Sequence, residues 1–243
     1  MKVLLLNGSP HAQGCTYTAL CEVAGALEKN GIETEIFHIG TKPIAGCIAC
    51  GSCLKTGKCV FDDGVNEFVE KAKQADGFIF GSPVYYANAS GQISAFLDRT
   101  FYGKSAIFEG KPGAAVVSCR RAGSTASLDQ LNKYFTISGM PVVSSRYWNM
   151  VHGNTPDEVR QDKEGLQIMR TLGNNMAWLL KCIELGRENG VSQKKNQLKR
   201  QILSDKKKGA VDYCTLFLML FRINLDKFFL TRGKSMLIIS LSI

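Results

Sequence analysis

The chain opens with a short aliphatic run that leads directly into a loop of small residues. Residues 2–7 are Lys-Val-Leu-Leu-Leu-Asn, a segment long enough for a strand that is buried on both faces. Residues 8–16 are rich in Gly, Ser and Thr, and an amphipathic helix is expected to begin at about Thr16. Strands buried on both faces belong to parallel sheets with helices on either side, so this segment already favours an α/β fold.

Strand-like and helix-like segments then alternate through residue 190. Strands are predicted at 2–7, 32–39, 77–81, 114–118 and 142–147. Helices are predicted at 16–30, from Asp62 or Asp63 to Ala75, at 91–101, at 124–138, and at 156–190 with a break near Gly165 or Gly173. This alternation predicts a doubly wound parallel sheet with right-handed crossovers and helices on both faces. Ligands of such sheets bind beyond the carboxyl ends of the strands, so the loops at 8–16, 82–90 and 118–125 are expected to meet there.

The loop at 8–16 has the features of an anion site at the start of a helix. Unpaired backbone N–H groups and the positive end of the helix dipole favour a phosphate there. The loop lacks the Gly-Lys-Ser/Thr ending of triphosphate loops and the Gly-x-Gly-x-x-Gly spacing of dinucleotide sites, so one terminal phosphate, as in FMN, suits it best. An ordinary β–α turn with a Thr cap is the alternative. The candidate phosphate-binding residues are Ser9, His11, Gly14, Cys15 and Thr16.

The loop at 82–90 offers groups that suit a flat heterocycle. Pro and Gly free backbone amides and carbonyls to address the polar edge of such a ring, and a tyrosine offers a stacking face. A surface turn with two half-buried tyrosines is the alternative. The candidate ring-binding residues are Pro83, Val84, Tyr85, Tyr86, Ala87 and Asn88.

The loop at 118–125 places two arginines near the same edge. A guanidinium group can bind a phosphate in a bidentate manner, so Arg120 and Arg121 are predicted to meet the phosphates of a pyridine nucleotide. Arginines that are simply solvated at the surface are the alternative. The candidate cofactor-binding residues of this loop are Ser118, Arg120 and Gly123.

Four cysteines, Cys47, Cys50, Cys53 and Cys59, follow the spacing C-x2-C-x2-C-x5-C. Thiolates this close can enclose one [4Fe–4S] cluster, and runs of C-x2-C-x2-C are typical of such ligation. A tetrahedral zinc ion is a chemical alternative, although zinc sites more often use two separated C-x2-C pairs. Metal-free thiols or a disulfide are the third alternative. The chain has nine cysteines and no secretory signal, which disfavours a disulfide scaffold.

Together these loops resemble those of a known family. Residues 1–190 resemble the NADPH-dependent FMN reductases of the flavodoxin-like superfamily. Residues 8–16 look like the phosphate loop of that family, and residues 81–85 with the Phe-Leu-Asp-Arg at 96–99 look like its isoalloxazine segment and the following helix. The cysteine spacing is similar to that of the iron–sulfur flavoproteins, a subgroup of the same family.

The resemblance implies a fold, a cofactor and an assembly. It implies a flavodoxin-like sheet of five parallel strands in the order 2-1-3-4-5, FMN as cofactor and NAD(P)H as co-substrate. It also implies that a [4Fe–4S] cluster at the four cysteines exchanges electrons with FMN, and that a homodimer or homotetramer covers the shallow FMN site. Two positions depart from the family pattern: His11 stands where Arg is usual, and Cys15 where Asn is usual.

The predicted function is therefore that of a cytoplasmic, FMN-dependent NAD(P)H oxidoreductase that passes electrons to a flavin, a quinone or a redox protein. The flavin carries the chemistry, so no side chain is assigned as a catalyst. An electron-transfer or redox-sensing protein without turnover of its own is the alternative, followed by a zinc-stabilised interaction module. No Ser/His/Asp arrangement or paired carboxylate suggests hydrolysis.

Residues 191–243 differ in character from the rest of the chain. The formal net charge is +9, but residues 191–243 contain 11 Lys/Arg and three Asp/Glu, which leaves 19 and 18 in residues 1–190. The predicted flavin domain is thus nearly neutral and gives no indication of nucleic-acid binding. The second part is basic and then apolar, and neither apolar run is long enough to span a membrane. It is interpreted as a partner-binding extension, a membrane-surface segment or sequence unrelated to the domain.

Overall fold

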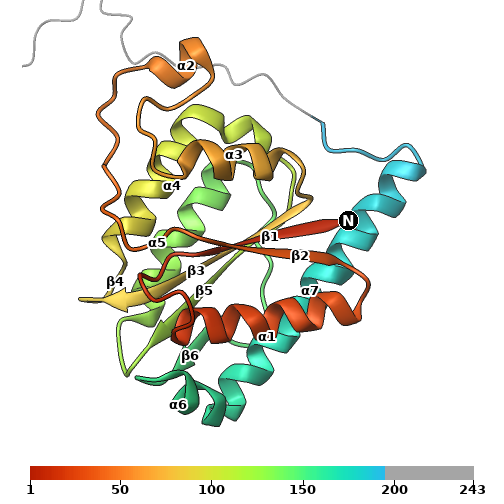
Figure 1. Ribbon diagram of the computed structural model, residues 1–243. Coiled ribbons are helices and arrows are strands. Elements are labelled where there is room, and N and C mark those ends of the chain that lie inside the picture. The colour runs from red at the N-terminus through yellow and green to blue at the C-terminus, as the bar shows by residue number, and fades with distance from the viewer. Residues whose placement is uncertain (195–243) are drawn as a thin grey trace, which may run out of the picture. The chain divides into compact units, whose positions relative to one another are not determined.

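The computed structural model describes residues 1–194 and has a central sheet between two layers of helices (Figure 1). The parallel strands are β1 (Lys2–Asn7), β2 (Glu33–His38), β3 (Gly77–Tyr85), β5 (Gly113–Cys119) and β6 (Met150–His152). They lie in the order β2-β1-β3-β5-β6, and the short strand β4 (Asn88–Ala89) pairs antiparallel with the end of β3. The predicted α/β fold is confirmed, and the antiparallel strand β4 is an addition to the predicted order.

Helices cover both faces of the sheet (Figure 1). One face is covered by α1 (Cys15–Lys29) and α7 (Lys163–Glu188), and the other by α3 (Val65–Lys73), α4 (Gly91–Lys104) and α5 (Ser124–Ile137). Three shorter elements complete the described chain: α2 (Ser52–Thr56) within the cysteine-rich loop, the 3-10 turn η1 (Ser105–Ile107) and α6 (Pro156–Gln161).

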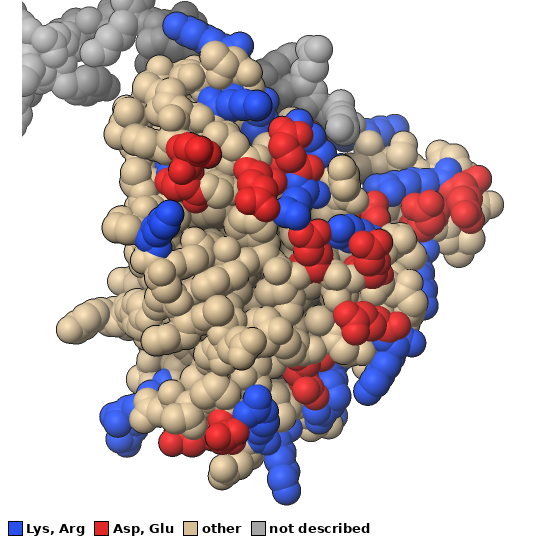
Figure 2. All heavy atoms as spheres, viewed as in Figure 1, with Lys and Arg blue, Asp and Glu red and all other residues tan. Residues whose placement is uncertain are grey.

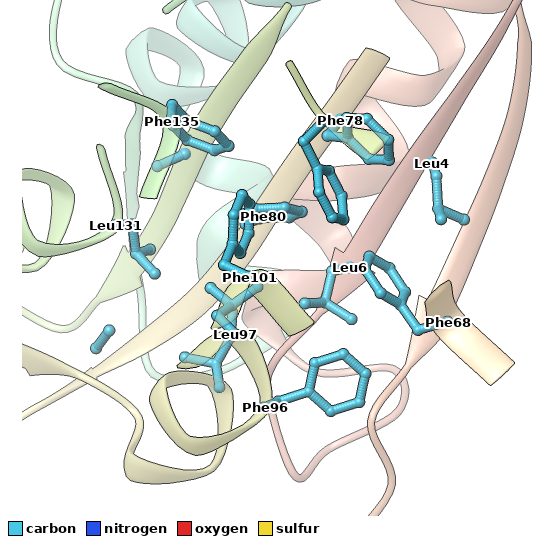
Figure 3. Packing of buried hydrophobic residues seen from close by; sticks show 14 of the residues in the cluster. Leu4, Leu6, Phe68, Phe78, Phe80, Phe96, Leu97, Phe101, Leu131 and Phe135 are labelled. Atoms are coloured by element: carbon cyan, nitrogen blue, oxygen red, sulfur yellow. The ribbon is translucent and has the colours of Figure 1, made fainter. Parts of the chain in front are cut away.

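Side chains of the central strands alternate between two apolar layers. On β1, Leu4 and Leu6 belong to the layer beneath α3 and α4, whereas Val3 and Leu5 belong to the layer beneath α1 and α7. The first layer is rich in phenylalanine, and Figure 3 shows its rings lying against β1 and β3. Full burial of each such side chain contributes about 1.5–3 kcal/mol, so the central strands are held firmly from both sides.

The prediction of a strand at 142–147 is wrong. Val142 makes an isolated bridge with Gly113, and the strand β6 begins only at Met150. Between these points the Ser145 hydroxyl donates a hydrogen bond to Tyr147 O at 2.6 Å. Such local side-chain bonds compete with the ladder of a sheet, which explains why this Val- and Tyr-containing stretch is irregular.

The predicted long helix at 156–190 consists of two helices, and its break lies at Asp162 rather than near Gly165 or Gly173. The Asp162 carboxylate accepts a hydrogen bond from the Gly165 N–H at 2.9 Å and so caps α7. Both glycines lie inside α7. A Cβ at Gly173 would lie 2.7 Å from the Ala26 Cβ, so this glycine allows α7 to approach α1 closely.

Residues Met1–Gln193 form one compact unit. From residue 195 onward, the predicted second part lies outside the described residues, so its role stays a prediction. Within residues 1–194, no helix combines the length and the apolar character needed to cross a membrane.

Candidate functional site

The carboxyl ends of β1, β3 and β5 bring the three predicted loops together. Asn7 at the end of β1 pairs with Gly81 of β3, and Pro83 of β3 pairs with Ser118 of β5. The Gly8 N–H donates a hydrogen bond to Gly81 O at 2.8 Å. The three loops expected to meet at this edge therefore do so.

A buried asparagine folds the first loop into a cradle. Asn7 is fully buried, and its Oδ1 accepts a hydrogen bond from the Ser9 N–H at 3.1 Å while its Nδ2 donates to Ala12 O at 3.2 Å. Among the described residues, no side chain caps α1 at Gly14, and the first turn of α1 carries no acidic residue. The N–H groups of that turn, together with the helix dipole, are therefore suited to an anion.

Buried hydroxyls link the first loop to the third. Thr16 Oγ1 and Ser118 Oγ lie 2.8 Å apart, and both side chains are buried. Ser9 Oγ accepts a hydrogen bond from the His11 N–H at 3.1 Å, and His38 Nε2 lies 2.8 Å from Ser9 O. A hydroxyl that accepts one hydrogen bond can still donate another, so Ser9 retains a donor for a ligand.

Two of the candidate phosphate-binding residues present different groups to this cradle. The His11 side chain is exposed at its rim. The Cys15 thiol donates to Gly153 O at 3.7 Å, and burial raises the pKa of this thiol. Because its thiol already donates to Gly153 O, Cys15 offers its backbone N–H to an anion.

The second loop is a strand and a tight hairpin rather than an irregular loop. Strand β3 extends to Tyr85, which pairs with Asn88 across the turn. Tyr86 and Ala87 at the turn have φ values of 50° and 62°, a region that costs a residue with a side chain about 1–3 kcal/mol. Tyr86 is fully exposed and Tyr85 is 46% exposed. Figure 2 shows that this face is largely uncharged where the hairpin projects, whereas acidic and basic side chains mingle on the opposite side.

Two serines fix the base of this hairpin. The Ser82 Oγ accepts a hydrogen bond from the Ser90 N–H at 2.9 Å. The Ser90 Oγ donates to Gly8 O at 2.9 Å and caps α4 by accepting from the Ile93 N–H at 3.3 Å. The hairpin, the first loop and α4 are thus joined through buried side chains.

The third loop approaches the hairpin through a glycine. Gly123 has a φ of +89°, and a Cβ there would lie 2.6 Å from the Ala87 Cα. Arg120 and Arg121 of the same loop are exposed. The loop therefore contributes close backbone contact to the hairpin and two exposed guanidinium groups to the rim.

The four cysteines predicted as ligands line one small pocket. Its other walls are formed by Ile48, Gly51, Val60, Phe61, Arg99 and Tyr102. All four cysteines are free thiols, and among residues 1–194 no three His, Cys, Asp or Glu side chains are grouped so as to hold a metal ion. The pocket thus contains the four thiols that a [4Fe–4S] cluster requires. No three of these thiols are grouped closely enough to bind one metal ion together.

A buried arginine that lies outside the cysteine spacing forms one wall of this pocket. Arg99 forms a bidentate ion pair with Asp63, in which Nη2 lies 2.7 Å from Oδ1, and its Nε donates to Cys59 Sγ at 3.2 Å. Burial alone would lower the pKa of Arg99, but its hydrogen bonds to Asp63 and Cys59 raise that pKa, so the side chain is charged. The sequence signal that could have revealed it is a charged residue on the apolar face of α4.

Comparison with known proteins assigns this architecture to a family. Residues 1–155 match the family model described as NADPH-dependent FMN reductase. The chain belongs to this family. An iron–sulfur flavoprotein of Methanocaldococcus jannaschii is 34% identical to this FMN reductase family member over 192 residues, which are 76% of this chain and 100% of the relative. An iron–sulfur flavoprotein of Methanosarcina thermophila is 31% identical over 195 residues, which are 77% and 100% of the two chains.

Solved structures agree with the fold of the FMN reductase family. A flavodoxin from the domain Archaea superposes with a TM-score of 0.52 at 16% identity, over 74% of this chain and 99% of that chain. Membership makes this protein an oxidoreductase that uses FMN for flavin-based redox chemistry. The edge described above fits that cofactor, because an uncapped helix start and buried hydroxyls suit its phosphate and a tyrosine hairpin suits its ring.

Proposed function

We propose that this protein passes electrons from NAD(P)H through FMN to a second acceptor, with a [4Fe–4S] cluster at the four cysteines as its second redox centre. The proposal rests on one edge of the sheet, the FMN edge, where an uncapped helix start, a buried hydroxyl pair and an exposed tyrosine hairpin meet. Bound FMN supplies a ring that accepts a hydride, and the protein supplies binding and orientation.

Each part of this edge has a role in the proposal. Ser9, Thr16 and the backbone N–H groups of residues 14–16 bind the FMN phosphate. Backbone groups of residues 83–88 address the polar edge of the ring, and a hairpin tyrosine covers one of its faces. Ser118 and Gly123 hold the third loop against this site, and the exposed Arg120 and Arg121 bind the phosphates of NAD(P)H.

Three observations support the proposed cluster. The four thiols line one pocket, the buried Arg99 places a positive charge beside one of them, and the relatives described above are named iron–sulfur flavoproteins. Cys47, Cys50, Cys53 and Cys59 would be its ligands, and the cluster would supply one-electron transfer. Zinc, or four metal-free thiols, would contradict this part of the proposal and leave the FMN site standing.

We further propose that the protein works as a homodimer or homotetramer. The full exposure of Tyr86, on a strained turn beside this edge of the sheet, supports the proposal, because a second copy would bury its ring. Light scattering coupled to size exclusion tests this, and a monomer at micromolar concentration would contradict it.

The deciding experiment is a visible spectrum of protein purified without oxygen, taken before and after NADPH, together with iron, sulfide and flavin assays. Flavin bands with a broad iron–sulfur shoulder, all bleached by NADPH, are expected. Flavin bands without iron would leave an FMN reductase with free thiols. A colourless protein that also fails to bind added FMN would overturn the proposal.

Steady-state oxidation of NADPH and of NADH, with a quinone or free FMN in excess, separates the enzyme from a carrier. Continuous turnover is expected. Reduction of the bound flavin once, with no turnover on any acceptor, would favour an electron-transfer protein instead.

A further inference from the structure

We propose that Arg99 positions Cys59 and raises the reduction potential of the cluster, by donating its Nε–H to the Cys59 sulfur while it clamps both ends of the cysteine loop onto α4. The inference rests on the proposed [4Fe–4S] site and extends it to a residue outside the cysteine motif.

Arg99 contacts the loop on both sides of the four cysteines. Its Nη1 donates to Ala45 O at 3.0 Å, two residues before Cys47, and to the Asp63 carboxylate, four residues after Cys59. The Phe61 ring centroid lies 4.8 Å from its Cζ, a cation–π arrangement. One side chain thus closes the loop that carries all four thiols.

The contact with sulfur is separate from the clamp. The two Nη groups already bind Asp63 and Ala45, so the clamp alone does not require the Nε–H to point at a sulfur. In this structure the Nε lies 3.2 Å from the Cys59 Sγ. The arginine side chain is 1% exposed, so this charge-assisted hydrogen bond is shielded from water on the side of its donor.

Helix α4 connects this arginine to the FMN edge. Its N-cap Ser90 hydrogen-bonds Gly8 O in the first loop, and Arg99 follows nine residues later, about 14 Å along the helix axis. Gly103 on the same helix faces another cysteine, since a Cβ there would lie 2.9 Å from the Cys53 Cβ. One rigid helix therefore sets the position of two cysteines relative to the first loop.

The consequence for the cluster follows from charge. Reduction adds a negative charge, and an N–H donor or a cation at a ligand sulfur stabilises the reduced form more than the oxidised form. Removal of that donor should therefore lower the midpoint potential of the cluster.

The test compares Arg99→Lys with Asp63→Asn in the anaerobically purified holoprotein, by a redox titration followed by EPR. Lysine keeps the charge and can pair with Asp63, but its single nitrogen leaves Cys59 without the Nε–H. Asp63→Asn keeps the Nε–H and removes a neighbouring negative charge. At a fixed potential we expect at least a tenfold higher oxidised-to-reduced ratio for Arg99→Lys, about 59 mV for one electron, and an equal or lower ratio for Asp63→Asn.

A second variant tests the same prediction in case Arg99→Lys does not fold. The double substitution Arg99→Gln with Asp63→Asn leaves no unpaired charge in the pocket and should also lower the potential. Loss of the cluster from both Arg99 variants, with FMN content and urea midpoint unchanged, would equally support the positioning role.

Three results would overturn the inference: a wild-type potential in both Arg99 variants, a shift in the same direction for Asp63→Asn and Arg99→Lys, or a joint loss of FMN and stability. Absence of iron and sulfide from the unaltered protein is a different failure. It would remove the cluster itself from the proposed function.

Discussion

The FMN edge and the cysteine pocket are built in opposite ways. At the FMN edge the key polar side chains are buried and already hydrogen-bonded: Asn7, Ser9 and Thr16 are 0%, 3% and 1% exposed. In the cysteine loop, Cys47 and Cys50 are exposed, and the regular structure is the five-residue helix α2. The first region lies on the ends of central strands, whereas the second is a long connection held by the side chains of Arg99 on α4 and Asn66 on α3.

The two regions therefore obtain their ligand-binding geometry in different ways. A site made of backbone N–H groups is complete once the strands and helices are formed, because the fold fixes those groups. A site made of four thiols places like charges close together when they ionise, so it needs its metal to offset their repulsion. The FMN edge should therefore be preformed, and the cysteine pocket should reach its final geometry only when the proposed cluster binds.

The largest expected effect separates the two regions. Cys59→Ala removes one of the four proposed ligands, so iron and sulfide should fall from about four atoms of each per chain to nearly none, while one FMN is retained. Metal and acid-labile sulfide assays beside flavin absorbance measure this. Cys182→Ala, which changes an exposed cysteine of α7 outside the pocket, is the matched control. Loss of FMN together with iron would show that the two regions do not form independently.

The reciprocal change addresses the FMN edge. Ser9→Ala with Thr16→Ala removes two hydroxyl donors to a phosphate, each worth about 1.5 kcal/mol or more, so the Kd for FMN should rise at least about 100-fold. Fluorescence titration of the apoprotein gives the Kd. Thr171→Ala, whose hydroxyl bonds its own helix at Gln167 O, is the control. An unchanged Kd would reject the phosphate assignment.

The next prediction concerns the close backbone contact between Gly123 and Ala87. Gly123→Ala forces a side chain into the left-handed region and against Ala87, so the free energy of unfolding should fall by about 1–3 kcal/mol and FMN affinity should fall with it. Urea denaturation of both variants measures the stability. Gly91→Ala is the control, because a Cβ there meets nothing within 4 Å. If stability falls but the FMN affinity stays, the hairpin contributes to the fold and not to the ring site.

A smaller and opposite effect is expected at the hairpin tip. Tyr86→Asn places a residue that tolerates positive φ at a fully exposed position, so the free energy of unfolding should rise by up to about 1 kcal/mol. Thermal unfolding of the apoprotein shows the gain. Weaker FMN binding by the same variant would identify Tyr86, and not Tyr85, as the tyrosine that stacks on the ring. A lower stability would mean that Tyr86 makes contacts in solution.

The sequence predicts correctly that the three loops meet at one edge of the sheet, because the causes are local or topological. Aliphatic runs between helices specify a parallel sheet, and the carboxyl ends of such strands converge by rule. The hairpin at Tyr86 was not expected, because its turn has neither Asn-Gly nor Asp-Gly. Arg99 was missed as a functional residue because its partners Asp63 and Cys59 are 36 and 40 residues away, and no spacing rule joins them. The break in the long helix was predicted at one of two glycines because glycine is the visible signal. Its true place is set by the hydrogen bond between the Asp162 carboxylate and the Gly165 N–H.

The smallest effect is expected from removal of residues 195–243. The described unit closes at the end of α7, where the Val191 N–H donates to Gly186 O at 2.8 Å and Gly190 has a φ of +74°. Truncation after Lys194 should therefore change the free energy of unfolding by less than about 0.5 kcal/mol and leave FMN content intact. Denaturation and flavin assays of the full and shortened chains measure both. A clear loss of stability or of FMN would mean that residues 195–243 contribute to the flavin domain. A third region would then stabilise the molecule beside the FMN edge and the cysteine pocket.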